Sequence, residues 1–343
     1  MKSNNVAVLR NEWKETVAKA TEIWVLTDGR AGNLTQALGL AEAIARLKPS
    51  QVSVKNAPLK PWAALVPPSI SHFVPASQRG WPFLGMAEEA DPLNWPWPDL
   101  IVSAGRRIAP ISAALKKLHG IPVVHLLDPQ MTPAAFDAVI VPQHDDLQGA
   151  SVLHSLGALN RQTRETVAAA GKAWRCPKQD LPIPQLAVLI GGPSKSARFT
   201  EADGKTLLLA LDTLAKNFGL LITTSRRTSP ELIGELRAKL SDRAFVWSGA
   251  DDGPNPYPGL LSPAVAILVT EDSVNMASEA ASTGKPVHVF PITSLAAKLV
   301  RFHEALEAHG ASQRYRGEIR HWQYEPLAEA DRIAADLMRR GIL

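Results

Sequence analysis

The sequence has very little cysteine, since Cys176 is the only one in 343 residues. A single cysteine excludes a disulfide framework and any zinc or iron–sulfur site built on cysteines, and it fits a reducing compartment. Long hydrophobic runs are also missing: no stretch of about 18 apolar residues occurs, which excludes a transmembrane helix. Residues 1–17 lack the apolar core of a signal peptide. We therefore expect a cytoplasmic protein, with a peripheral position at the inner face of a membrane left open.

The rest of the composition describes a folded protein with a mild excess of positive charge. Apolar residues make up 45% of the chain and charged residues 20%, which is ordinary for a globular protein and too apolar for disorder. A length of 343 residues suggests two domains. The formal net charge of +4 favours anionic partners such as nucleotides, phosphates or acidic membrane surfaces. HExxH and DxD motifs are absent, and we expect no metal site.

Short apolar runs alternate with segments of helical periodicity, and this pattern occurs twice. It is typical of β-α units around a parallel sheet. The runs expected to be strands are 23–26, 51–54, 100–104, 123–127 and 138–141 in the first half and 187–190, 220–224, 245–247, 264–269 and 287–290 in the second. The expected helices of the second half are 200–217, 230–240, 273–283 and 294–309.

The two halves meet at a proline-rich connector. A segment of helical periodicity, 161–174, is followed by CPKQDLPIPQ, whose prolines favour an extended chain. We place the boundary there, with a first domain over 1–175 and a second over 176–325.

A long segment of the first half, 59–99, does not follow the alternation. It is crowded with proline and carries Trp62, Trp81, Trp95 and Trp97. A loop of that length inside a compact domain is usually functional or an ordered insertion. Two interpretations stay open: a surface loop whose aromatic side chains pack inward, or a contact with a membrane or an acceptor.

Each half opens with a strand that runs into a polar, glycine-containing turn and then a helix. Ligands of parallel sheets bind at the carboxyl ends of strands, where helix N-termini offer free N–H groups. Neither turn matches GxxxxGK[ST] or GxGxxG, so neither a P-loop nor a dinucleotide site is predicted. The first turn and its helix supply the candidate residues Asp28, Gly29, Arg30, Gly32, Asn33 and Gln36. The second turn supplies Gly191, Gly192, Ser194 and Lys195.

Adjacent arginines follow a strand in each half. Arg226 and Arg227, preceded by Ser225, come after the strand 220–224. Two guanidinium groups at that position suit a diphosphate, although arginines at the end of a strand are also often only solvated. Arg106 and Arg107 follow the strand 100–104, so the first half has a candidate anion site of its own.

The segment 265–292 is the most informative part of the sequence. Its strand ends at Thr270, a helix begins at Ser273, and Met276 and Glu279 follow within two turns. The free N–H groups of that helix can hold a diphosphate while the Glu279 carboxylate accepts hydrogen bonds from a ribose. The alternative is a helix with a capping acid and a solvated glutamate.

Several blocks together resemble the mitochondrial fission ELM1-like family, whose bacterial members are described as glycosyltransferases. The blocks are LTDGRAGNLTQALGLAEA, SAGRRIAPISAALKK, HLLDPQ, FDAVIVPQHD, IGGPSKSARF, TTSRRT and VTEDSVNMASEAASTGKPV. They occur in order from about residue 24 to 291 and cover most of the chain. The resemblance implies an α/β fold of the GT-B type, in which two Rossmann-like domains face a cleft. It also implies that a final helix, within 326–343, returns to the first domain, a role that Ile333 and Leu337 suit.

The resemblance implies transfer of a sugar from a nucleotide diphosphate sugar to a sugar or lipid-linked acceptor, with no further cofactor. The resemblance also implies that the second domain binds the donor and that the first binds the acceptor. No nucleic-acid partner is expected, and the oligomeric state is left open. A scaffold that has lost catalysis, and a sugar-nucleotide epimerase or hydrolase, are the alternatives.

A transferase also needs a base for the acceptor hydroxyl. We favour Asp28, which follows the first strand, and next His144 and Asp145; His125, within an apolar strand, is expected to be a core histidine, and Asp128 is a weaker candidate. Glu271 and Glu279 have the spacing of the E-x7-E pair of retaining GT-B enzymes. Because Glu271 falls at the strand end and not clearly on the helix, the stereochemical outcome is unassigned.

Overall fold

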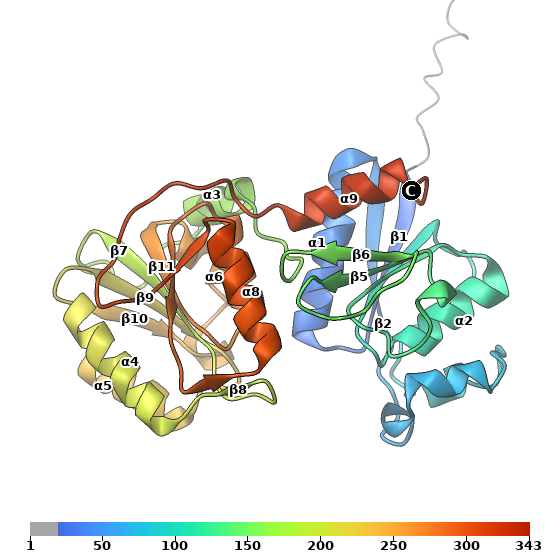
Figure 1. Ribbon diagram of the computed structural model, residues 1–343, viewed down its shortest axis with the longest axis horizontal. Coiled ribbons are helices and arrows are strands. Elements are labelled where there is room, and N and C mark those ends of the chain that lie inside the picture. The colour runs from blue at the N-terminus through green and yellow to red at the C-terminus, as the bar shows by residue number, and fades with distance from the viewer. Residues whose placement is uncertain (1–19) are drawn as a thin grey trace, which may run out of the picture.

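The computed structural model describes residues 20–343, and residues 1–17, in which no signal-peptide pattern was found, lie outside that range. Two parallel six-stranded sheets form the centres of two halves that lie side by side (Figure 1). The first sheet has the strand order β2-β1-β3-β4-β5-β6. Its strands are β1 (Thr21–Thr27), β2 (Ser50–Asn56), β3 (Leu100–Ala104), β4 (Val123–Leu126), β5 (Ala138–Pro142) and β6 (Val152–Ser155).

The second sheet repeats this design with the order β10-β9-β7-β11-β12-β14. Its strands are β7 (Gln185–Ile190), β9 (Gly219–Thr224), β10 (Ala244–Trp247), β11 (Ala264–Thr270), β12 (Val287–Phe290) and β14 (Ser312–Arg314). A small antiparallel pair, β8 (Ala197–Arg198) and β13 (Ser294–Leu295), lies beside it. All ten strands expected from the sequence are present, while β6, β14 and this pair were not expected.

Helices cover both faces of each sheet, because the strands are apolar on both faces. In the first half α1 (Ala31–Leu47) covers one face and α2 (Ala109–His119) the other. In the second half α4 (Glu201–Leu214) and α5 (Pro230–Lys239) cover one face. The opposite core contains side chains of α3 (Arg164–Ala173), α6 (Tyr257–Leu261), α7 (Val274–Ser282) and α8 (Ala297–Ala308). A capping box of Thr200 and Asp203 begins α4.

The chain crosses between the halves twice, after β6 and again before α9 (Glu329–Arg339). Helix α9 packs against α1, and Ile333 and Leu337 are fully buried in the first core. The C-terminal helix therefore returns to the first half, as expected. Helix α3 packs on α6, and Val167 is part of the hydrophobic core of the second half. The expected domain boundary after residue 175 therefore follows a helix that already packs in the second half.

The segment 59–99 forms short 3-10 turns over the α2 face of the first sheet: η1 (Ala63–Leu65), η2 (Pro68–His72) and η3 (Phe83–Gly85). Trp97 packs inward between Trp24 and His119, with ring centroids 6.0 Å and 4.0 Å away. Trp95, in contrast, is 78% exposed. The segment thus has one inward-packed part and one part that presents apolar side chains to solvent.

Candidate functional site

Three loops at the carboxyl ends of β7, β9 and β11 are joined by one carboxylate, that of Asp272. Its side chain is fully buried. It accepts hydrogen bonds from the Gly192 N–H at 2.9 Å, the Thr270 hydroxyl at 2.7 Å and the Arg227 guanidinium at 2.7 Å. The Thr270 hydroxyl accepts in turn from the Gly191 N–H at 2.8 Å. Because a buried charge needs partners, Arg227, the Gly192 N–H and the Thr270 hydroxyl stabilise Asp272 and hold the loops together.

The two glycines of the second turn allow this close packing. A Cβ on Gly191 would lie 2.0 Å from an Asp272 oxygen, and a Cβ on Gly192 would lie 2.2 Å from the Arg227 carbonyl oxygen. Their backbones therefore approach neighbouring loops of the protein. Ser194 stabilises the turn by accepting from the Ser196 N–H at 3.2 Å.

The arginine pair after β9 divides into two different environments. The Arg227 guanidinium points inward to Asp272, and the Arg227 backbone N–H donates to the Ser225 hydroxyl at 3.1 Å. Arg226 is exposed, and so is Lys195 on the neighbouring turn. Neither of these two cations has a hydrogen bond or ion pair among residues 20–343. Of the two arginines, only Arg226 is therefore free to meet an anion.

The N-terminus of α7 lies against the first half of the molecule. Ser273 caps the helix by accepting from the Met276 N–H at 3.3 Å. The Asn275 side chain accepts from Gln36 on α1 at 3.4 Å. A Cβ on Gly32 would lie 3.0 Å from the Asn275 amide nitrogen. The first turns of α1 and α7, which are far apart in sequence, therefore meet at the interface between the halves.

Two carboxylates flank this helix start in different ways. Glu271 is buried and accepts from the Ile292 N–H at 3.1 Å and from Arg314 at 3.4 Å. Glu279 is half-buried, and burial raises its pKa from 4.5 to about 7, while the neighbouring Tyr257 hydroxyl acts in the opposite direction. A glutamate whose pKa lies near 7 is unusual, and this marks Glu279 as a candidate functional residue.

The first turn of the first half surrounds Asp28. Its side chain is 4% exposed, pairs with Arg30 at 3.4 Å and accepts from the Arg30 N–H. Gly29 has a φ of +83°, which favours glycine. Asn33 lies so close to Gly105 that a Cβ there would come within 2.3 Å of the Asn33 amide. This contact joins the first turn to the loop that carries Arg106 and Arg107.

The other candidate bases are held by neighbours. The His144 ring packs on Phe302 with centroids 5.5 Å apart, and burial lowers its pKa. Asp145 lies 3.7 Å from Lys298 of α8, and Arg301 of the same helix donates to the His144 carbonyl oxygen at 2.8 Å. These residues connect the halves. Asp128 is exposed and accepts from the Gln130 N–H.

His125 is a core residue, as its apolar strand suggested. It is fully buried, bonds to the Ser103 hydroxyl at 2.9 Å and stacks on Phe136 at 4.9 Å between ring centroids. Burial lowers its pKa from 6.5 to about 3. It is therefore neutral at physiological pH.

Sequence reasoning missed the residues that connect elements distant in the chain. Those residues are Asp272, Asn275, Lys298, Arg301 and Arg314. The only sequence signal for Asp272 was its position between the end of a strand and the cap of a helix. Ordinary capping residues occupy the same position, so this signal does not distinguish Asp272 from them. In residues 20–343 no group of three or more His, Cys, Asp or Glu side chains is arranged to hold a metal ion. Across that range we also find no helix with the length and apolar character needed to span a membrane.

Two parallel-sheet halves whose helix starts meet at their interface, and a last helix that returns to the first half, define an α/β protein of the GT-B type. Solved structures of the same fold include the S. aureus MnaA complex with UDP, at 13% identity and a TM-score of 0.51, over 93% of this chain and 88% of that one. A UDP-N-acetylglucosamine 2-epimerase is 15% identical with a TM-score of 0.50, over 95% and 97%. At these identities the likeness shows the fold alone.

The chain belongs to the Mitochondrial fission ELM1 family, whose sequence profile matches residues 31–341. It is 29% identical to the Mitochondrial fission protein ELM1 of Arabidopsis thaliana over 279 residues, which are 71% of this chain and 65% of that protein. The chain thus spans just under two thirds of the length of the plant relative. An uncharacterized protein of Rickettsia prowazekii is 28% identical over 91% of this chain and 96% of its own length.

Proposed function

We propose that this protein transfers a sugar from a nucleotide diphosphate sugar to the hydroxyl of a sugar or lipid-linked acceptor. The observation that carries the proposal is a pair of cations, Lys195 and Arg226, that are unpaired among residues 20–343 and lie on the loops after β7 and β9, whose Gly192 and Arg227 contact Asp272 just before α7. Leaving diphosphates need positive charge, which cations and helix N-termini supply without a metal ion. The GT-B-type fold supports a donor site in this half.

The donor in this proposal lies along α7. Its diphosphate meets Ser273 and the first turn of the helix, while Arg226 and Lys195 approach from the neighbouring loops. Glu279, two turns further along, accepts hydrogen bonds from the ribose hydroxyls. Arg227 has a structural role in this proposal, because its guanidinium already forms an ion pair with Asp272. It holds the loops in position and does not contact the donor.

The acceptor side consists of the first turn of α1 and the Arg106–Arg107 loop. Asp28 follows β1 directly and is the proposed base that takes the proton of the acceptor hydroxyl. Arg30, whose guanidinium lies 3.4 Å from the carboxylate, orients it. Gln36 and Asn275 join the two sides by their hydrogen bond.

The first test of this function is a thermal-shift screen with nucleotides and nucleotide sugars. A ligand present at about 100 times its Kd stabilises the folded state by about 2.7 kcal/mol. Stabilisation by a nucleoside diphosphate supports the donor site. Its complete absence for all nucleotides would favour a non-catalytic scaffold.

The second test separates transfer from other chemistry on the same ligand. Nucleotide sugar labelled in the sugar is incubated with the protein and a membrane extract, and the label is followed into product. We expect label in an acceptor and a loss of transfer for Asp28→Asn, with donor affinity retained. Label that appears only as free sugar or as an isomeric nucleotide sugar would instead indicate a hydrolase or an epimerase.

A further inference from the structure

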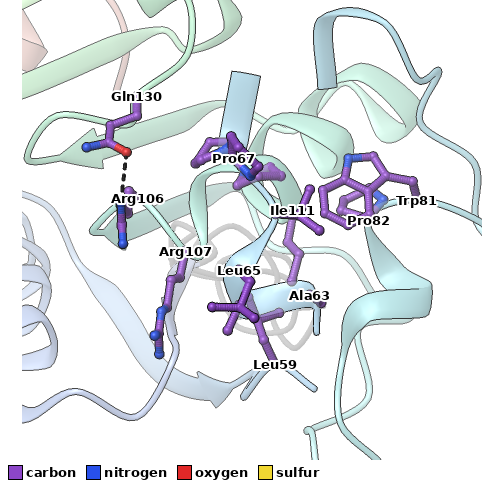
Figure 2. A pocket seen from close by; sticks show the side chains of 14 residues that line it. Leu59, Ala63, Leu65, Pro67, Trp81, Pro82, Arg106, Arg107, Ile111 and Gln130 are labelled. Atoms are coloured by element: carbon purple, nitrogen blue, oxygen red, sulfur yellow. Dashed lines mark hydrogen bonds between the residues drawn. The ribbon is translucent and has the colours of Figure 1, made fainter. Parts of the chain in front are cut away.

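A pocket of about 340 Å³ lies between the segment 59–99 and the start of α2. Its size is within the range of sites that bind small molecules. Figure 2 shows Arg106, Arg107 and Gln130 on one side and Ile111, Trp81 and Pro82 on the other. The pocket thus has two chemically different walls.

The polar wall is cationic and incompletely paired. Arg106 donates to the Gln130 side chain at 3.1 Å. The Nε of Arg107 is buried and has no hydrogen-bond partner among the described residues. No acidic side chain lines the pocket, and the N-terminus of α2, at Ala109, adds its positive dipole end. Arg106 is exposed and Arg107 is partly exposed, so their guanidinium groups can form charge-assisted hydrogen bonds with an anion at this wall.

The opposite wall requires an apolar ligand group. Its lining residues share aliphatic or aromatic side chains: Leu59, Ala63, Leu65, Pro67, Trp81, Pro82 and Ile111. Inorganic phosphate would leave this wall uncovered. The ligand that satisfies both walls therefore carries an anionic group and an apolar chain in the same molecule.

Apolar side chains of the same segment project into solvent. Leu65 and Phe73 are each 83% exposed, and Leu84 and Trp62 are 58% and 48% exposed. Large exposed apolar groups gathered on one segment are typical of surfaces that meet another protein or a membrane. The cationic wall behind them favours a membrane that contains phosphate-bearing lipids.

We propose that this pocket binds a phosphate-bearing lipid supplied by a membrane surface. The phosphate lies against Arg106 and Arg107, and the first part of the hydrocarbon chain lies against Leu65, Ile111 and Trp81. Phe73 and Leu84 enter the surface of the bilayer. That this lipid is the sugar acceptor rests on the proposed function, whereas its binding does not.

The pocket is tested with a soluble probe, dioctanoyl phosphatidic acid, by calorimetry. We expect saturable binding that Arg106→Ala with Arg107→Ala weakens by about 10- to 100-fold, since hydrogen bonds to charged groups are lost. Arg340→Ala, which removes an exposed charge at the end of α9 on the opposite face of the first sheet, is the matched control and leaves binding unchanged. Equal binding by the double variant and the wild type overturns the proposal, and so does phosphate ion that binds as tightly as the lipid.

The membrane source is tested by flotation with vesicles. Vesicles of phosphatidylcholine with phosphatidic acid should carry the protein, and vesicles of phosphatidylcholine alone should not. Phe73→Ser with Leu84→Ser should reduce flotation while leaving the calorimetric affinity for the soluble probe within about threefold, because Phe73 and Leu84 are mostly exposed and do not line the pocket. Flotation that is insensitive to phosphatidic acid, or to both pairs of substitutions, contradicts the proposal. UDP-induced thermal stabilisation, measured on the same variants, reports the donor site separately, so its failure leaves the lipid result standing.

Discussion

Replacement of Glu279 by glutamine should make the protein more stable and a poorer binder of nucleotides. Burial raises the pKa of this carboxyl from 4.5 to about 7. A shift of that size corresponds to at most about 3 kcal/mol of unfavourable free energy for the ionised group in the folded state. Glutamine keeps the shape and carries no charge, so above pH 7 it removes this cost.

The pH dependence of this effect has a definite sign. Below pH 4.5 the carboxyl is protonated in both folded and unfolded states, and it contributes no slope. Between pH 4.5 and about 7 the folded state binds more protons than the unfolded state, so wild-type stability falls as the pH rises. The stability difference between Glu279→Gln and the wild type should therefore grow through this window and level off above it, as measured by urea unfolding.

Nucleotide binding should change in the opposite direction. If the ionised carboxylate accepts both ribose hydroxyls, Glu279→Gln weakens UDP binding by about 1 to 3 kcal/mol. Wild-type affinity should also increase as the pH rises through about 7, whereas the affinity of the variant stays flat. A dideoxy analogue of UDP should bind both proteins alike. If the variant loses the same affinity for UDP and for the dideoxy analogue, Glu279 is structural and the donor site is misplaced.

Two further substitutions test the placement of charge described above. Arg227→Ala should lower the free energy of unfolding by about 3 to 5 kcal/mol, because it leaves the buried Asp272 carboxylate without its cation. Arg226→Ala should change the free energy of unfolding by less than about 0.5 kcal/mol and should weaken UDP binding. Denaturant unfolding and calorimetry distinguish the two, and similar stability losses would refute the division. Burial lowers the pKa of His125 from 6.5 to about 3, so the wild type should lose stability as the pH falls through this window, by at most about 5 kcal/mol. His125→Gln should show a smaller slope in the same unfolding measurements, and an unchanged slope would assign the acid sensitivity to other groups.

The architecture could be predicted from the sequence because apolar runs and helical periodicity are local signals. Runs such as 100–104 are buried on both faces and could be identified without knowledge of their partner strands. The two missed strands at the edges of the large sheets, β6 and β14, have only four and three residues, and β14 consists of polar SQR. Such strands form because a sheet edge is already present, which is not a property of their own residues.

The loops of the candidate site could be proposed from the sequence, but the pairing among their side chains could not. Arg226 and Arg227 look alike in the sequence, and only the fold places Asp272, 45 positions away from Arg227, against one of them. The position of His144 after a strand suggested a catalytic base, but in the fold its ring packs on Phe302 of α8. The roles of such residues depend on contacts between distant segments, about which spacing along one chain carries no information.

The return of α9 to the first half has a consequence for the order of folding during synthesis. Ile333, Ala334 and Leu337 belong to the same core as Ile23 and Leu40, although the whole second sheet lies between them in the chain. Nascent domains usually fold in the order in which they leave the ribosome. In this chain one side of the first core stays uncovered until α9 has been synthesised. The second sheet is complete once β14 has been synthesised, so the second half is the first that can complete its folding.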